Sequence, residues 1–151
     1  MTISRSELEG RNVIRIVAAL AMNDEGKALL VRKRGTSAFM QPGGKMLEGE
    51  PPLIALEREI REELGCGVDR GSARNLGTFS APAANEPGST VQAELFAVRL
   101  SGTVEAQAEI EEAIWVDPAD LQGLVLAPLT ENHAMPLARE WKGLRSRNSA
   151  A

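Results

Sequence analysis

The stretch 44–66, GKMLEGEPPLIALEREIREELGC, constrains the fold more than any other part of the chain. Its apolar residues recur every three or four positions, the spacing that lines one face of an amphipathic helix. They are Leu53, Leu56, Ile60 and Leu64. Pro51 and Pro52 suit a helix start, where missing N–H groups matter least, and Gly65 suits a helix end. We therefore expect a helix over about Pro52–Leu64, buried along its apolar stripe.

The same helix carries three carboxylates beside that stripe. Glu59 stands three and four positions before Glu62 and Glu63, so all three share one face. Like charges at this spacing repel by a few tenths of a kcal/mol per exposed pair. A hard divalent cation would relieve that repulsion, because it takes carboxylate oxygens as ligands and keeps some waters. This face therefore favours metal-assisted phosphate chemistry.

The spacing of the polar residues in this stretch resembles the signature of the Nudix hydrolases, in particular the MutT-like members. It reads Gly, five residues, Glu, seven residues, Arg-Glu, an aliphatic residue, one residue, Glu-Glu, one residue, Gly. The matching positions are Gly44, Glu50, Arg58, Glu59, Ile60, Glu62, Glu63 and Gly65. The final aliphatic position is occupied by Cys66, which behaves as a small hydrophobe when buried.

The rest of the chain predicts strands around this helix, and therefore an α/β domain. Apolar and alternating patterns place the strands at Asn12–Met22, Lys27–Arg34, Asn75–Ala81, Thr90–Leu100 and Ala113–Val116, with a loop over Pro82–Ser89. Asp117-Pro118 predicts a short helix to about Leu121. Leu137, Trp141 and Leu144 predict a last helix.

The resemblance implies a Nudix α/β/α sandwich with a mixed β-sheet, in which the signature forms a loop, a helix and a loop. We expect a single domain over residues 1–151, with an ordered core over about 12–144 and flexible ends at 1–11 and 146–151.

The resemblance also assigns roles to individual residues. It implies that Glu59, Glu62 and Glu63 bind metal, that one of them serves as the base, and that Arg58 orients them. It adds the Gly43 carbonyl and a distant carboxylate as further ligands. The distant carboxylate is expected in the acidic stretch before Trp115, where Glu109 and Glu112 are the candidates. Loop geometry decides between those two.

Cations upstream of the helix are candidates for binding substrate phosphates. In the strand expected at Lys27–Arg34, Arg32 and Arg34 share one face, and Lys33 lies on the other with Val31. We expect Arg34, and with it Arg32, to meet phosphates. Gly44 would let the backbone approach the substrate, and Lys45 is an additional phosphate contact.

Other reactive or aromatic residues are expected to be structural. Phe39, Trp115 and Trp141 are interpreted as core residues. Cys66 is a packing residue, because no partner for a nucleophile lies near it in the sequence. His133, the single histidine, is interpreted as a loop or capping residue.

Composition limits the partners. The net charge is −4, and an extended basic face for nucleic acid is not evident. No apolar run reaches membrane-spanning length, and one cysteine suits a reducing cytoplasm. We expect a cytoplasmic protein that binds a small nucleotide and neither nucleic acid nor membrane, with a homodimer left open by the resemblance.

These observations predict a magnesium-dependent Nudix hydrolase, with manganese as the alternative ion. It would cleave a pyrophosphate bond in a nucleoside diphosphate linked to another group, with a nucleoside tri- or diphosphate as first choice. Three alternatives stay open: an ADP-ribose or nucleotide-sugar pyrophosphatase, a nucleotide sensor without catalysis, and an interaction protein that uses the acidic helix as a contact face.

Overall fold

Strand β1 (Val13–Ala21) lies at the centre of a four-stranded sheet in the computed structural model, which describes residues 12–141. Its side chains alternate between two hydrophobic clusters, with Val17 and Ala19 on one side and Ala18 and Leu20 on the other. Strict alternation is the period of a strand that is buried on both faces. The expected first strand is confirmed.

The sheet is mixed, as expected. Its order is β3-β1-β5-β4, with β3 over Gly43–Lys45, β4 over Gly67–Pro82 and β5 over Thr90–Ser101. Strand β1 runs parallel to β5 and antiparallel to β3, while β4 runs antiparallel to β5. A separate antiparallel pair joins β2 (Ala28–Lys33) to β6 (Ile110–Val116).

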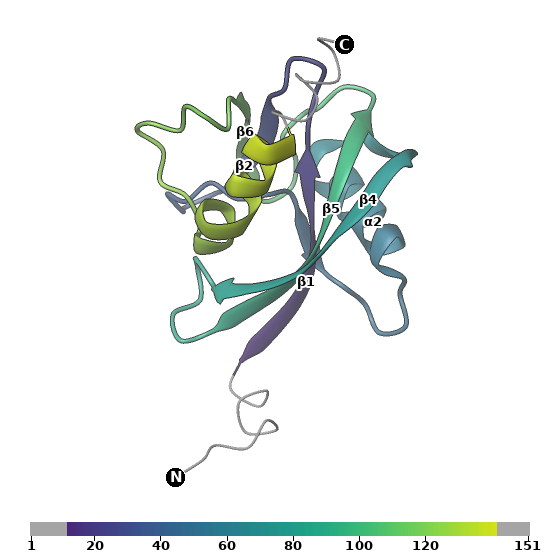
Figure 1. The fold of residues 1–151 in the computed structure, drawn as a ribbon. Coiled ribbons are helices and arrows are strands. Elements are labelled where there is room, and N and C mark those ends of the chain that lie inside the picture. Colours follow the sequence, from purple (N-terminus) through teal and green to yellow (C-terminus); the bar gives the residue numbers. More distant parts are fainter. Residues whose placement is uncertain (1–11, 142–151) are drawn as a thin grey trace.

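Helices cover both faces of this sheet (Figure 1). Helix α2 (Pro52–Leu64) packs on one face through Leu56, Ile60 and Leu64, which are fully buried. On the other face lie residues 128–141, a helical segment that includes the π-helical turn η1 (Thr130–Ala134). The α/β/α layering predicted from the sequence is therefore confirmed.

The bounds of α2 follow from its end residues. Pro51 precedes the first turn, and Gly65 ends the helix in the left-handed conformation, with φ of 65°. The Gly65 N–H donates to the Arg61 carbonyl at 3.0 Å, which satisfies one of the last free carbonyls. The bounds predicted from these residues match the structure.

Three local predictions need correction. Asp117-Pro118 forms a turn instead of a helix, because the Asp117 carboxylate accepts from the Ala119 N–H at 3.0 Å and its carbonyl accepts from Asp120 N–H. Trp115 is not a core residue, since 37% of it is exposed on β6. His133 lies inside η1, not in a loop, and its Nε2 lies 3.2 Å from the Ser80 carbonyl oxygen.

Two strands are longer than predicted. Strand β4 begins at Gly67 instead of Asn75, and β6 begins at Ile110 instead of Ala113. Both extensions are rich in polar residues, which mask the strand pattern, and both are held by pairing with the partner strand, β5 for β4 and β2 for β6.

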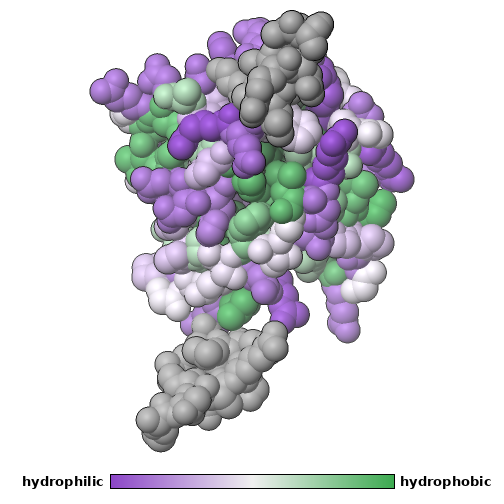
Figure 2. Space-filling view, in the orientation of Figure 1, coloured by the Kyte–Doolittle hydropathy of each residue, from purple (hydrophilic) through white to green (hydrophobic). Residues whose placement is uncertain are grey.

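Other structural interpretations are confirmed. Phe39 and Cys66 are buried, and Trp141 is partly buried against the second cluster with Leu137. Leu144 and the flexible ends expected at 1–11 and 146–151 lie outside the described residues. On the face drawn in Figure 2, hydrophilic side chains are interspersed with smaller hydrophobic areas, as 25% charged residues would suggest. Within residues 12–141, no helix combines the length and the hydropathy needed to cross a membrane.

Candidate active site

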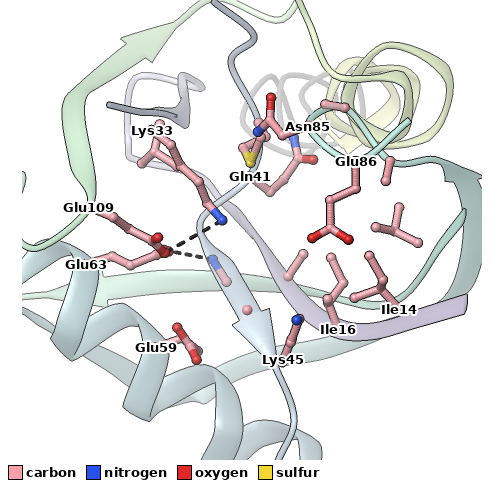
Figure 3. Close-up of a pocket in the computed structure, with 18 residues that line it drawn as sticks. Ile14, Ile16, Lys33, Gln41, Lys45, Glu59, Glu63, Asn85, Glu86 and Glu109 are labelled. Carbon is pink, nitrogen blue, oxygen red and sulfur yellow. Dashed lines mark hydrogen bonds and ion pairs between the residues drawn. The ribbon is translucent and has the colours of Figure 1, made fainter. Parts of the chain in front are cut away.

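A cavity of about 410 Å³ lies where β1, β3, α2 and the β4–β5 loop meet. Figure 3 shows Glu59, Glu63 and Glu109 at one side of it and Asn85, Glu86, Ile14 and Ile16 at the other. Lys33 and Lys45 contribute the cations. The cavity therefore has an acidic end with nearby lysines and an opposite, aliphatic end, at which the polar side chains of Asn85 and Glu86 also lie (Figure 3).

The two glycines of β3 bring the backbone against the acidic end. A Cβ at Gly43, where φ is 152°, would lie 2.1 Å from the Val17 carbonyl oxygen. A Cβ at Gly44 would lie 2.4 Å from the carboxyl carbon of Glu59. The Val17 backbone cannot move aside, so Gly43 must be glycine if the strand is to pair with β1. A side chain at Gly44 would instead displace the carboxylate of Glu59.

Glu63 is the most buried of the three acidic helix residues. Only 3% of it is exposed, and one carboxylate oxygen accepts a hydrogen bond from the Gly43 N–H at 3.0 Å. Burial raises the pKa of Glu63 to about 8, and the nearby Glu59 and Glu109 add to the rise. The Gly43 N–H and the charge of Lys33 oppose it. Within residues 12–141, this carboxyl group forms no ion pair with a lysine or arginine, although Lys33 lies close enough to influence its pKa.

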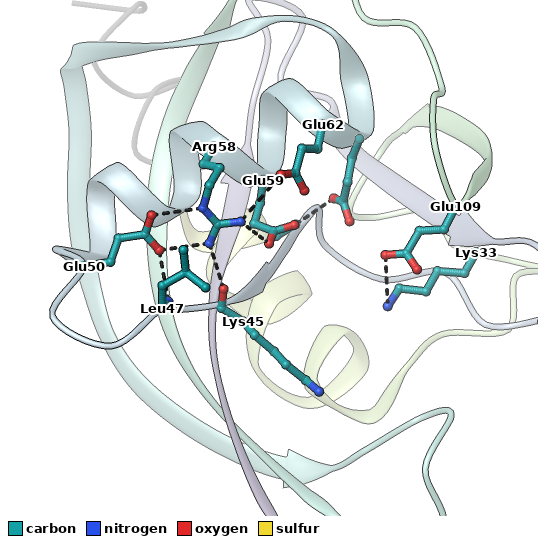
Figure 4. Close-up of polar contacts among 10 residues, drawn as sticks. Lys33, Lys45, Leu47, Glu50, Arg58, Glu59, Glu62 and Glu109 are labelled. Carbon is teal, nitrogen blue, oxygen red and sulfur yellow. Dashed lines mark hydrogen bonds and ion pairs between the residues drawn. The ribbon is translucent and has the colours of Figure 1, made fainter.

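Arg58 links the loop before α2 to the carboxylates of the helix (Figure 4). Its guanidinium donates to both oxygens of Glu50, at 2.9 and 3.0 Å, to the Lys45 carbonyl at 3.0 Å and to Glu59 at 2.8 Å. The hydrogen bonds from Arg58 and from the Leu47 N–H lower the pKa of Glu50 to about 2. The same pairing raises the pKa of Arg58 above its usual range. Arg58 thus holds the Glu59 carboxylate through this hydrogen bond.

Glu109 reaches the cavity from the residue just before β6. Its backbone carbonyl accepts from the Arg34 N–H at 2.9 Å, and its carboxylate lies 3.6 Å from the Lys33 ammonium. Both side chains line the cavity with Glu63. Of the two candidate distant carboxylates, Glu109 is the one that the structure brings to the acidic end.

Five predicted site residues do not line the cavity. One of them is Arg58, which contacts the lining residue Glu59 at 2.8 Å. The side chain of Glu62 is 58% exposed and lies 3.8 Å from Arg58. Arg32 pairs with Glu112 at 3.0 Å. Arg34 pairs with Glu111 at 3.3 Å. The structure therefore brings Gly43, Gly44, Lys45, Glu59, Glu63 and Glu109 together and places Arg32, Arg34, Arg58, Glu62 and Glu112 outside the cavity lining.

Sequence reasoning missed two parts of the cavity. Lys33 was recognised as a local cation, but its strand face was not chosen, although Val31 shares that face and also lines the cavity. The loop 83–86 was expected only as a connection, yet it forms one wall. Val31 and Lys33 are two residues apart and therefore share a strand face, so the sequence could have indicated that Lys33 lines the cavity. The sequence of a loop has no such periodicity from which to predict its position.

The donor set fits a hard divalent cation. No group of three or more His, Cys, Asp or Glu side chains within residues 12–141 is already close enough to hold a metal ion. Magnesium needs only one or two carboxylates, because it keeps several waters and takes phosphate oxygens. Glu63 and the adjacent Glu59 and Glu109 supply those oxygens. A cation would stabilise the charged form of Glu63, which burial disfavours.

Comparisons with known proteins point to one family. The model of the NUDIX domain matches residues 13–139. The crystal structure of a MutT NUDIX hydrolase from Burkholderia pseudomallei aligns with a TM-score of 0.68 and 26% identity, over 85% of this chain and 97% of that one.

Two curated relatives match over shorter stretches. An RNA pyrophosphohydrolase from Halorhodospira halophila is 43% identical over 51 residues, which is 34% of this chain and 28% of the relative. An 8-oxo-dGTP diphosphatase from Haemophilus influenzae is 36% identical over 59 residues, which is 36% of this chain and 43% of the relative. The chain thus spans less than half the length of each of these two relatives.

Proposed function

Because this chain belongs to the family of NUDIX domains, we propose that it hydrolyses a phosphoric anhydride bond in a nucleoside diphosphate linked to another group. The observation that carries the proposal is the meeting of Glu59, Glu63 and Glu109 with Lys33 and Lys45 in one cavity. Our first choice of substrate is a nucleoside tri- or diphosphate. The relatives named above as a pyrophosphohydrolase and a diphosphatase support this type of reaction.

A divalent metal ion, for which we propose magnesium, would polarise phosphate oxygens and acidify an attacking water when bound. Glu63 and Glu59 would hold it, with Glu109 and the Gly43 carbonyl as further donors. Lys33 and Lys45 would attract the negative phosphates to the same end of the cavity, since the protein as a whole carries −4.

Proton removal from the water is assigned to the cluster of Glu59, Glu63 and Glu109. A carboxylate that has given up its proton to solvent can accept one from water within hydrogen-bond reach. Arg58 restrains Glu59 through a 2.8 Å bond, which keeps that carboxylate beside Gly44. Water exclusion would come from the aliphatic wall opposite, which includes Ile14, Ile16 and Val91.

The test is hydrolysis of a panel of nucleoside triphosphates, nucleoside diphosphate sugars, ADP-ribose and dinucleoside polyphosphates, with and without magnesium. Phosphate and pyrophosphate release are measured separately. Glu63→Gln should reduce turnover by about 100-fold or more. Glu57→Gln is the matched control, because it makes the same change on α2 at a residue that pairs with Arg70.

Each outcome has a clear meaning. Metal-dependent turnover that is lost in Glu63→Gln and kept in Glu57→Gln would support the proposal and define the substrate class. Turnover that survives in Glu63→Gln would refute the assignment of that residue. Nucleotide binding with no turnover of any substrate would refute hydrolysis and favour a sensor.

A further inference from the structure

A smaller recess of about 70 Å³ adjoins the aliphatic end of the active-site cavity. The two share Ile16, Met40 and Gln41 among their lining residues. The recess is completed by apolar and small side chains, which are Pro82, Ala127, Leu129 and Thr130 together with Ala84 and Val91. Because the recess is small and opens beside the larger cavity, it can admit only the edge of a group that lies in that cavity.

Gln41 places an unpaired hydrogen-bond donor in this recess. It is only 6% exposed, and its Oε1 accepts a hydrogen bond from the Thr130 hydroxyl at 3.0 Å. Its Nε2 is buried and has no hydrogen-bond partner among the residues that the structure describes. A buried donor without a partner destabilises a fold. Such a group is therefore a candidate for contact with a ligand.

The surrounding backbone holds Gln41 in place. On its N-terminal side, Met40 and Val31 exchange two backbone hydrogen bonds of 2.8 Å. On its C-terminal side, the Pro42 carbonyl accepts from the Ala19 N–H at 2.9 Å. Thr130 is presented by the π-helical turn η1, and π-helical turns are frequent at functional sites. The amide is thus fixed at both its main chain and its carbonyl oxygen.

No aromatic ring lines either space within the described part of the chain. A nucleobase there would be held between aliphatic side chains such as Ile16, Met40 and Val91, which contact a flat face without orienting it. Polar groups at the edge must then supply the orientation. Two polar residues line the recess within the described part of the chain, Gln41 and Thr130. The Thr130 hydroxyl already donates to Gln41, which leaves the Gln41 amide N–H₂ for a ligand.

We propose that the base of the nucleotide substrate lies at the aliphatic end of the cavity with one edge in the recess, and that Gln41 Nε2 donates to the exocyclic carbonyl oxygen of a keto base at that edge. Guanine carries a carbonyl at O6 and thymine or uracil at O4, where adenine and cytosine carry amino groups. An amide N–H that meets an amino group leaves two donors facing each other, so the keto bases are preferred. This inference rests on the proposed function, because the acidic end must hold the phosphates for the base to lie at the aliphatic end.

The experiment compares two matched pairs of nucleotides, GTP with ATP and UTP with CTP. Affinity for each is measured by calorimetry in calcium, and KM and kcat for each are measured in magnesium. The variant is Gln41→Met, which keeps an unbranched side chain of similar length and removes the amide. The control is Gln92→Leu, at a residue of β5 that lines neither space.

We expect the wild type to bind and turn over the keto member of each pair about tenfold better, as one net hydrogen bond would give. Gln41→Met should reduce that preference to within about threefold, mainly through KM, while Gln92→Leu keeps it. Thr130→Val provides a second variant, because it frees the amide to rotate and should weaken the preference in the same direction.

Equal affinity and equal kcat/KM of the wild type for keto and amino bases would overturn the inference. So would a preference for amino bases, or a keto preference that survives in both Gln41→Met and Thr130→Val. Failure of the proposed function looks different, since it would abolish turnover in magnesium for every nucleotide while the calorimetric comparison still reports on the recess.

Discussion

Replacing Glu63 by Gln should stabilise the metal-free protein, and the gain should depend on pH. The pKa of Glu63 is raised from 4.5 to about 8 in the folded state. A carboxyl whose pKa rises on folding stabilises the fold fully below pH 4.5, and this stabilisation is lost as pH rises toward 8. Glutamine stays neutral at every pH, and its carbonyl can still accept the Gly43 N–H.

The size of the effect follows from the two pKa values. Each pKa unit corresponds to about 1.4 kcal/mol. Between pH 5.0 and pH 7.5 the wild type should lose about 3 kcal/mol of unfolding free energy through this group. For a domain of this size, that is a difference in Tm of about 6–12 °C. Placing the amide N–H₂ of glutamine in the site carries an energetic penalty that does not change with pH. The informative quantity is therefore the change with pH of the difference in unfolding free energy between Glu63→Gln and wild type.

The assay is thermal and urea unfolding of wild type and Glu63→Gln in EDTA at pH 5.0, 6.0, 7.0 and 7.5. The stability of the variant relative to wild type should increase steadily over this range. Glu57→Gln, on the same helix and paired with Arg70, is the control and should show no such trend. Added magnesium should stabilise the wild type and not Glu63→Gln. A difference that is constant from pH 5.0 to 7.5 would refute the reasoning, because it would mean that Glu63 is ionised in the folded state.

Three further predictions concern the rest of the site. Gly43→Ala should lower the unfolding free energy by about 1 to 3 kcal/mol more than Gly49→Ala. Both glycines have positive φ, but only a Cβ at Gly43 would meet backbone atoms. Similar unfolding free energies for the two variants in urea would contradict this. Arg58→Lys should destabilise by about 1 to 2 kcal/mol in the same assay, since lysine cannot pair with both oxygens of a carboxylate; an unchanged midpoint would show that the fork is dispensable. Lys33→Met should raise KM by about tenfold and Arg34→Met by little, as only Lys33 lines the cavity; steady-state kinetics with the reverse ranking would restore the assignment made from the sequence.

The helix α2 could be predicted to the residue because three independent signals agreed. The apolar stripe gave the period, the proline pair gave the start and Gly65 gave the end. The central strand β1 was equally clear, since its apolar run over residues 16–21 is typical of a strand that is buried on both faces. Local chemistry and tertiary packing point the same way in both elements.

The candidate site was harder to predict where two faces looked alike. In β2, each face of the strand carries both leucine or valine and a cation, so alternation alone could not say whether Lys33 or Arg34 faces the cavity. The pairing of β2 with β6 decides which cation faces the cavity, and the register of this pairing shifts between Arg32 and Lys33. Glu109 was only slightly preferred to Glu112 from the sequence, because the positions of both residues depend on that pairing.

The loop before α2 is connected to the helix by one chain of hydrogen bonds, from Arg58 to Glu50 and from the Leu47 N–H to Glu50. Hydrogen exchange at the Leu47 amide can therefore report on the opening of this connection. The Leu47 N–H donates only to the Glu50 carboxylate at 3.0 Å among the contacts described, although the Leu47 residue is 59% exposed. Its exchange with deuterium therefore follows the opening of this one connection and not the unfolding of the core. Exchange at this amide, read beside amides of β1, would show whether a ligand tightens the loop before catalysis begins.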